Sequence, residues 1–158
     1  MSQKEQSKST ETISRATSAD FGKTTDDVKV KMPGKVIVRQ LEKHKDSAYS
    51  EERQCSVFIA DLPSYTVSVD ITLIKPDSHD RKHRHYYETL LFILDGSGYS
   101  IIEGERVEWE AGDALHIPPW SWHQHFNTDS DKEVRYLAAT NAPLLQGVGG
   151  VAIREEAG

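Results

Sequence analysis

Several features of common protein classes are missing from this sequence. Its 158 residues include one cysteine, Cys55, so no internal disulfide and no cluster of thiolate metal ligands can form. The longest apolar run, Leu90 to Leu94, is far shorter than the ~20 residues that a membrane-spanning helix needs. No apolar stretch typical of a secretory signal occurs near the N-terminus. These absences predict a cytoplasmic protein that is not inserted in a membrane.

An excess of positive charge is also missing. Lys and Arg number 19 against 25 Asp and Glu, which gives a formal net charge of −6. Proteins that bind nucleic acid through its phosphates need a basic surface, so this class of function is disfavoured. Hydrophobic residues make up 37% of the chain, enough for one modest core, which excludes a fully disordered chain.

The composition changes along the chain. Residues 1–33 contain few large apolar side chains, so we expect a mobile N-terminal tail that cannot offset the entropy lost on ordering. The interpretation assigns residues 34–145 to one folded domain and residues 146–158 to a C-terminal tail.

The folded part shows short apolar segments separated by turn residues. These segments are rich in Val, Ile, Tyr, Phe and Thr, and they recur about every 8–12 residues with no long helical period. This pattern predicts an all-β sandwich or barrel, with a short helical turn within residues 141–150. The predicted strands are residues 35–41, 55–62, 65–74, 88–94, 97–103, 106–110, 113–118, 122–127 and 133–140.

Histidines form two closely spaced pairs. His83 and His85 are separated by one residue, as are His123 and His125. Residues at positions i and i+2 of a strand point to the same face, so each pair can present two imidazoles to one point. A single pair of this kind is also common on protein surfaces. Two pairs on strands of one β domain favour a metal site, because imidazole is a common ligand of Zn, Fe, Ni and Cu.

The residues around both pairs resemble the two motifs of the cupin family. The first motif is matched by His83, His85 and Gly96, and the second by Gly112, Pro118, His123 and Asn127, with Trp120 in place of a second glycine. The resemblance covers about residues 35–145. It implies a cupin double-stranded β-helix, which is a jelly-roll barrel.

The glutamate that many cupins use as a metal ligand is missing from its place. That motif position is Thr89, and the neighbouring Glu88 falls on the strand face opposite His83 and His85. We therefore expect Glu88 to point away from the metal. The expected ligand set is three histidines: His83, His85 and His123.

This three-histidine pattern is similar to the gentisate and salicylate dioxygenase group of cupins. Those proteins also read His-Arg-His without the glutamate and carry the Pro-x-Trp-x-Trp-His-x-His-x-Asn pattern found at residues 118–127. The resemblance implies non-haem Fe(II) and O2-dependent cleavage of a hydroxylated ring. It gives His125 a substrate-facing, proton-handling role, and Tyr87 is a second candidate for that role because it shares the histidine face.

One position departs from that group. Leu91 stands where those enzymes carry an arginine that receives the substrate carboxylate. With Thr89, Trp120 and Trp122 as further pocket candidates, the sequence predicts an apolar, aromatic mouth, although large aromatics more often pack in cores and interfaces. Gentisate and salicylate should then react poorly, neutral metal-chelating compounds should react better, and Leu91→Arg should improve the binding of carboxylated aromatics.

Three functional hypotheses remain open from sequence. The first is a dioxygenase-like enzyme with Fe(II), or with Mn, Ni or Zn in its place. The second is a metal-dependent lyase, isomerase or cyclase. The third is a non-catalytic cupin that binds a small molecule. A homodimer is expected in each case, because jelly-roll sheets expose edge strands.

Overall fold

The computed structural model describes residue 22 and residues 24–27, 29–43 and 48–158. The chain divides into two units, Met1–Pro33 and Gly34–Gly158. Within the first unit, the described residues include one short 3-10 helix, η2, at Thr25–Asp27. Most of the predicted mobile tail, including residues 1–21, lies outside the described residues.

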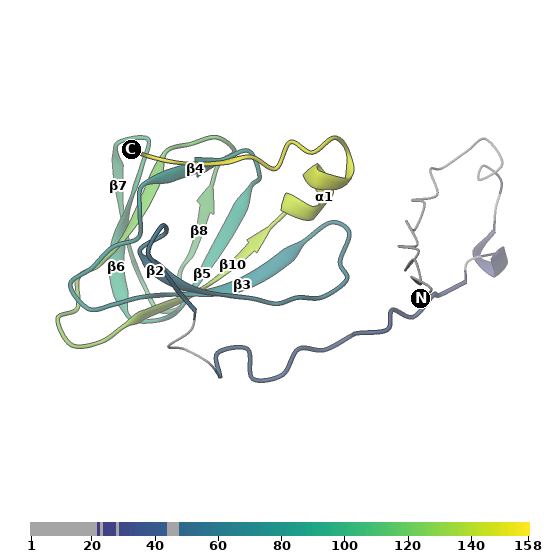
Figure 1. The fold of residues 1–158 in the computed structure, drawn as a ribbon, viewed down its shortest axis with the longest axis horizontal. Helices are drawn as coiled ribbons and strands as arrows, with labels where there is room; N and C mark the ends of the chain where they lie inside the picture. Colours follow the sequence, from purple (N-terminus) through teal and green to yellow (C-terminus); the bar gives the residue numbers. More distant parts are fainter. Residues whose placement is uncertain (1–21, 23, 28, 44–47) are drawn as a thin grey trace, which may run out of the picture. The chain divides into compact units, whose positions relative to one another are not determined.

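The second unit consists of two antiparallel sheets that face each other (Figure 1). The larger sheet has the strand order β1-β2-β3-β10-β5-β8, and the smaller has the order β11-β4-β9-β6-β7. The predicted all-β class is confirmed. The elements are β1 Tyr49–Ser50, β2 Cys55–Ile59, β3 Ser68–Ile74, β4 His83–His85, β5 Thr89–Asp95, β6 Ser97–Ile102, β7 Glu105–Glu110, β8 Ala114–Ile117, β9 His123–Asn127, β10 Val134–Thr140, α1 Ala142–Gly147 and β11 Arg154–Glu156.

The apolar core follows from the alternation of side chains along the strands. On β10, Val134, Tyr136 and Ala138 are buried, while the residues between them are only partly covered. They pack with inward-facing residues of β5 and β8 and with Trp109 of β7. Full burial of an aliphatic side chain stabilises the fold by roughly 1.5–3 kcal/mol, so this cluster holds the two sheets together.

The strand predicted at residues 35–41 does not form. Gln40 has a φ of 52°, a left-handed conformation that interrupts an extended segment. Leu41 instead packs on Phe58, Ile71 and Leu73. These three buried residues lie on the side of the larger sheet that faces away from the second sheet, so the segment covers that side rather than extending a sheet edge.

The C-terminal region contributes more structure than its composition indicated. Helix α1 lies within the predicted helical turn, and a proline occupies its first turn. Part of the segment assigned to a C-terminal tail is strand β11, which pairs with β4 so that Arg154 lies opposite His85. No helix among the described residues is long and apolar enough to cross a membrane.

Gly98 on β6 allows three strands to approach closely. It pairs with Trp109 on one side and with Asn127 on the other. A Cβ at this position would overlap the carbonyl oxygen of Phe126 and would lie 2.6 Å from Cη2 of Trp109. A larger residue therefore has to move β6 away from β9 or displace the Trp109 ring.

We predict that Gly98→Ala lowers the free energy of unfolding by about 1–3 kcal/mol, because overpacking forces backbone shifts. Thermal and urea unfolding measure the effect. Gly147→Ala in α1 is the control, since a Cβ there meets nothing within 4 Å. Equal stability of the Gly98→Ala variant and the wild type would contradict this account of the strand spacing.

Candidate metal centre

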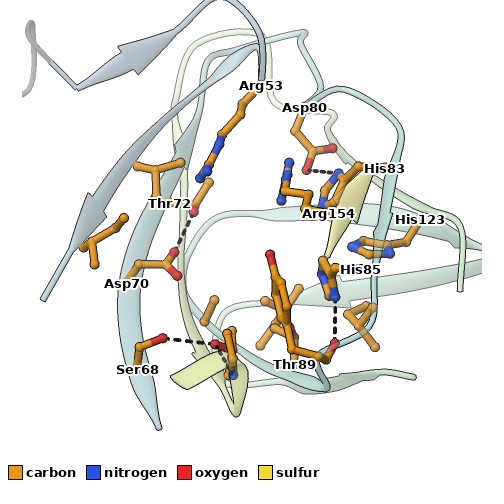
Figure 2. A pocket seen from close by; sticks show the side chains of 18 of the residues that line it. Arg53, Ser68, Asp70, Thr72, Asp80, His83, His85, Thr89, His123 and Arg154 are labelled. Atoms are coloured by element: carbon orange, nitrogen blue, oxygen red, sulfur yellow. Dashed lines mark hydrogen bonds and ion pairs between the residues drawn. The ribbon is translucent and has the colours of Figure 1, made fainter. Parts of the chain in front are cut away.

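Pairing of β4 with β9 brings the predicted histidines together. His83 lies directly opposite His123 in the register, and both side chains are buried with those of His85 and His125. Figure 2 shows His83, His85 and His123 along one wall of a cavity. The ring centroids of His83 and His123 are 4.1 Å apart, and those of His85 and His123 are 4.7 Å apart. Potential ligand nitrogens of the three residues lie within 4.8 Å of one another.

Backbone carbonyls fix the orientation of all three rings. The Nδ1 atoms of His83, His85 and His123 lie 2.7, 2.7 and 2.8 Å from the carbonyl oxygens of Arg81, Tyr87 and Ser121, respectively. A carbonyl oxygen can only accept, so each Nδ1 carries a hydrogen and each Nε2 keeps a free lone pair. Metal-binding histidines typically donate their second ring nitrogen in this way.

Burial keeps these rings neutral. It lowers the pKa of His85 to about 4 and that of His123 to about 2, and it lowers the pKa of His83 further. Neighbouring histidines add to the effect at His83 and His123. A metal ion requires neutral imidazole, so the three rings are ready to coordinate at neutral pH. Three neutral, buried nitrogen donors on one wall of a cavity fit a divalent transition metal.

His125 lies beside this group but makes a different hydrogen bond. Its Nδ1 is 2.7 Å from Oγ of Ser100, and the same oxygen accepts a hydrogen bond from Nε1 of Trp109 at 2.9 Å. The Ser100 hydroxyl hydrogen is then directed at Nδ1 of His125, which places the His125 proton on Nε2. His125 thus presents an N–H donor where its three neighbours present lone pairs.

A buried carboxyl group, that of Asp80, contacts both strands that carry the histidines. Asp80 accepts a hydrogen bond from the backbone N–H of His125 at 2.7 Å, and its other oxygen lies 3.9 Å from Nδ1 of His83. Burial raises the pKa of Asp80 to about 8. No sequence motif marks Asp80, because its role depends on a loop that folds back on β9.

The cavity beside the histidines has a volume of about 320 Å³. Tyr87 and Thr89 both line it, as predicted, and Leu91 lines it within the buried core. The Tyr87 ring stacks on the His85 ring with centroids 3.9 Å apart and an interplanar angle of 6°. The Thr89 hydroxyl is buried with no hydrogen-bond partner among the described residues.

The structure places the predicted tryptophans elsewhere. Trp120 and Trp122 do not line this cavity; the Arg84 guanidinium lies 4.1 Å from the centre of the Trp120 ring and 4.5 Å from that of Trp122. Trp122 precedes His123 on the chain, so strand alternation turns it away from the histidine face. Trp120 has a φ of 63°, which explains why the cupin motif has a glycine at this position.

Glu88 also lies outside the histidine group. Its carboxylate is exposed and lies 2.8 Å from Nε2 of His116, on the other side of β5 from Thr89. Glu88 points away from the histidines, as the sequence indicated. The reason differs, because the chain bends at residues 86 and 87 and passes from β4 to β5 in the other sheet, so the strand does not continue after His85.

Two arginines line the cavity and were missed. Arg53 precedes β2, and Arg154 is the first residue of β11. Nε of Arg154 lies 2.8 Å from Glu156. Burial lowers the pKa of this guanidinium, but Glu156 and Tyr87 together outweigh burial and raise it. The prediction of an apolar mouth without a cation is wrong. No motif marks either arginine, since both reach the cavity through pairing of distant segments.

Comparisons with known proteins agree with these observations. A model of the cupin domain family matches residues 71–140. Gentisate 1,2 dioxygenase 1 of Aquipseudomonas alcaligenes is 37% identical over 76 residues, which are 48% of this chain and 22% of the relative. A 1-methylthio-D-xylulose 5-phosphate methylsulfurylase of Rhodospirillum rubrum is 34% identical over 70 residues, or 44% of each chain.

The fold is also similar to a solved structure. Salicylate 1,2-dioxygenase from Pseudoaminobacter salicylatoxidans with gentisate has a TM-score of 0.63 and 13% identity, over 75% of this chain and 33% of the other. The matched segment spans only about a fifth of the curated dioxygenases.

We predict about one divalent metal ion per chain. Alanine at His83, His85 or His123 should lower the metal occupancy at least ~10-fold, because a site with two remaining ligands binds a metal weakly. Metal analysis of protein purified without chelators measures this. Glu88→Gln is the control and should keep its metal. Wild-type metal content in all three alanine variants would rule out the assignment.

Proposed function

Since residues 71–140 match the model of the cupin domain family, we propose that this chain is a metal-dependent, dioxygenase-like enzyme acting on a small chelating organic substrate. The observation that carries the proposal is the set of three neutral imidazoles at one wall of a cavity. We propose Fe(II) as the metal, with Mn, Ni or Zn compatible with the same donors. When bound, Fe(II) would supply open positions for a chelating substrate and for O2.

Different residues take different roles in this proposal. His83, His85 and His123 hold the metal through Nε2. His125 and Tyr87 handle protons: the first presents an N–H, and the second presents a phenol hydroxyl at the cavity.

The arginines change the expected substrate. Sequence analysis disfavoured gentisate and salicylate because Leu91 provides no cation. Arg53 and Arg154 both face the cavity, so the desolvation of a carboxylate has a partner there. Two of the dioxygenase relatives are named for gentisate and 5-aminosalicylate, which are carboxylated aromatic compounds. We therefore include hydroxylated aromatic acids among the proposed substrates. Leu91→Arg is no longer expected to help, because Leu91 is only 3% exposed and packs in the core.

A second candidate is a metal-dependent lyase, isomerase or cyclase without O2 chemistry. The methylsulfurylase relative favours it, because that protein is matched over a larger share of its own length than the dioxygenases are. Tyr87 and His125 could serve as acid and base in such a reaction as well.

An O2 electrode with product analysis separates the two candidates. We expect the Fe(II)-loaded protein, but not the metal-free protein, to consume O2 with at least one compound among gentisate, salicylate, catechol and acetylacetone. His125→Asn and Tyr87→Phe should lower kcat about 10²-fold while keeping the metal, since each removes a proton-transfer group. No O2 uptake with any compound would contradict the dioxygenase, and turnover without O2 would favour the second candidate.

The assembly and compartment are further parts of the proposal. Leu90 and Phe92 on β5 point away from the core and are 56% and 45% exposed, and we propose that this surface pairs two copies of the chain. The buried free thiol of Cys55 suits the reducing cytoplasm, where we propose the protein works.

Sedimentation equilibrium tests the dimer. We expect a homodimer in the wild type, and a dissociation constant at least ~10-fold higher for the double variant Leu90→Lys with Phe92→Lys, because two charges would be buried unpaired. Val107→Lys, at an exposed position of the other sheet, is the matched control. A monomeric wild type at micromolar concentration would refute the dimer.

A further inference from the structure

The cavity wall opposite the histidines is polar. Strand β3 turns every second residue inward, so Ser68, Asp70 and Thr72 all line the cavity. Figure 2 shows these three side chains along one strand, across the cavity from His85 and His123. Ser68 shares a hydrogen bond of 3.0 Å with Thr140, so both hydroxyls of that pair have a partner.

Asp70 is only partly satisfied. Its Oδ1 accepts a hydrogen bond from the Thr72 hydroxyl at 3.1 Å, and no hydrogen bond reaches its Oδ2 from the part of the chain that the structure describes. Its neighbours on the adjacent strands, Ile59 of β2 and Ala138 of β10, also line the cavity and are apolar. One carboxylate oxygen therefore faces the cavity without a protein donor. A carboxylate oxygen that lines a cavity and has no protein donor is free to accept a hydrogen bond from a ligand.

The carboxyl group of Asp70 is in the charge state that a hydrogen-bond acceptor needs. Burial raises the pKa of this carboxyl to about 6, against the lowering effects of the Thr72 hydrogen bond and of the Arg53 and Arg154 charges. The group is thus ionised at neutral pH. Figure 2 shows Arg53 reaching toward the same wall, but no hydrogen bond or ion pair joins the Arg53 and Asp70 side chains among the described residues. Asp70 is therefore not occupied by a salt bridge.

We propose that Asp70 recognises the substrate: its Oδ2 accepts a hydrogen bond from a hydroxyl or amine on the part of the substrate farthest from the metal. This inference rests on the proposed function. It narrows the substrate to a compound with two features, a metal-chelating pair of oxygens at one end and a hydrogen-bond donor at the other. A carboxylate cannot donate, so Asp70 also disfavours compounds with an acceptor or an anion at that end.

Two compounds isolate this contact. Gentisate and salicylate share the carboxylate and the adjacent hydroxyl that can chelate a metal, and gentisate carries a second hydroxyl across the ring. The wild-type protein loaded with Zn(II), which is redox-inert, should bind gentisate at least ~10-fold more tightly than salicylate in calorimetric titrations, as expected for a hydrogen bond to a charged group.

The variants assign the difference to Asp70. In Asp70→Ala the preference should fall to less than ~3-fold, with salicylate affinity little changed. Thr72→Ala is the matched control on the same wall, since it removes the bond to Oδ1 and leaves Oδ2 in place, so it should keep the preference. If Asp70→Ala does not fold, Asp70→Asn, which keeps the shape without the charge, should show a smaller loss of the same sign.

Two results would overturn the inference alone: tight binding of both compounds by the wild type without discrimination, or an unchanged preference in Asp70→Ala. Failure of the wild-type, metal-loaded protein to bind either compound would instead contradict the chelating substrate of the proposed function, and the inference with it. Circular dichroism and metal analysis of each variant accompany the titrations, so that a loss of fold or metal is not mistaken for a loss of recognition.

Discussion

The pairing of β4 with β9 is the constraint on which the site depends. His83 and His123 are direct partners in this register, and His85 is two residues further on the same face. Because side chains alternate with a period of two, a slip of one residue would turn every imidazole to the other side. Strand β11 flanks β4 on its second edge, so that β4 is held between two strands.

Burial of this pairing determines the chemistry of the cavity. Loss of water favours the neutral form of the four histidines, which prepares three of them for a metal. The same loss of water makes each buried oxygen depend on a partner, and the protein supplies one for most of them. Among the described residues that line the cavity, the buried exception is Oγ1 of Thr89. The partly exposed Asp70 also has an oxygen, Oδ2, that accepts no hydrogen bond from the described residues. A substrate that spans the two sheets would meet nitrogen donors for a metal on one side and oxygen acceptors on the other.

Strand alternation accounts for what could be predicted from the sequence. It is a local property, so it placed His83 and His85 on one face without knowledge of the fold. Tyr87 and Thr89 also line the cavity, but they follow a bend that carries the chain from β4 to β5 in the other sheet. The same rule turns Trp122, the neighbour of His123, away from the cavity, and the structure places it outside the cavity lining. The expected strand at residues 35–41 failed for a local reason, the left-handed conformation of Gln40.

The remaining site residues depend on contacts between distant segments. Arg154 lines the cavity because the chain turns back after α1 and β11 pairs with β4. No sequence motif predicts this pairing. Arg53 precedes a short strand. Asp70 lacks a charged partner among the described residues because its neighbours on β2 and β10 are apolar, and this pairing cannot be read from the sequence. These three residues replaced the apolar pocket inferred from Leu91 with a charged and hydrogen-bonding one.

X-ray absorption spectroscopy at the metal edge of anaerobically purified protein tests the central claim most directly, because it reports both the metal and its ligands. The account predicts a divalent metal with three imidazole nitrogens, no thiolate sulfur and water-derived oxygens in the remaining positions. A metal with fewer than two imidazoles, or with a sulfur ligand, would contradict it, as would protein that holds no metal when purified without chelators.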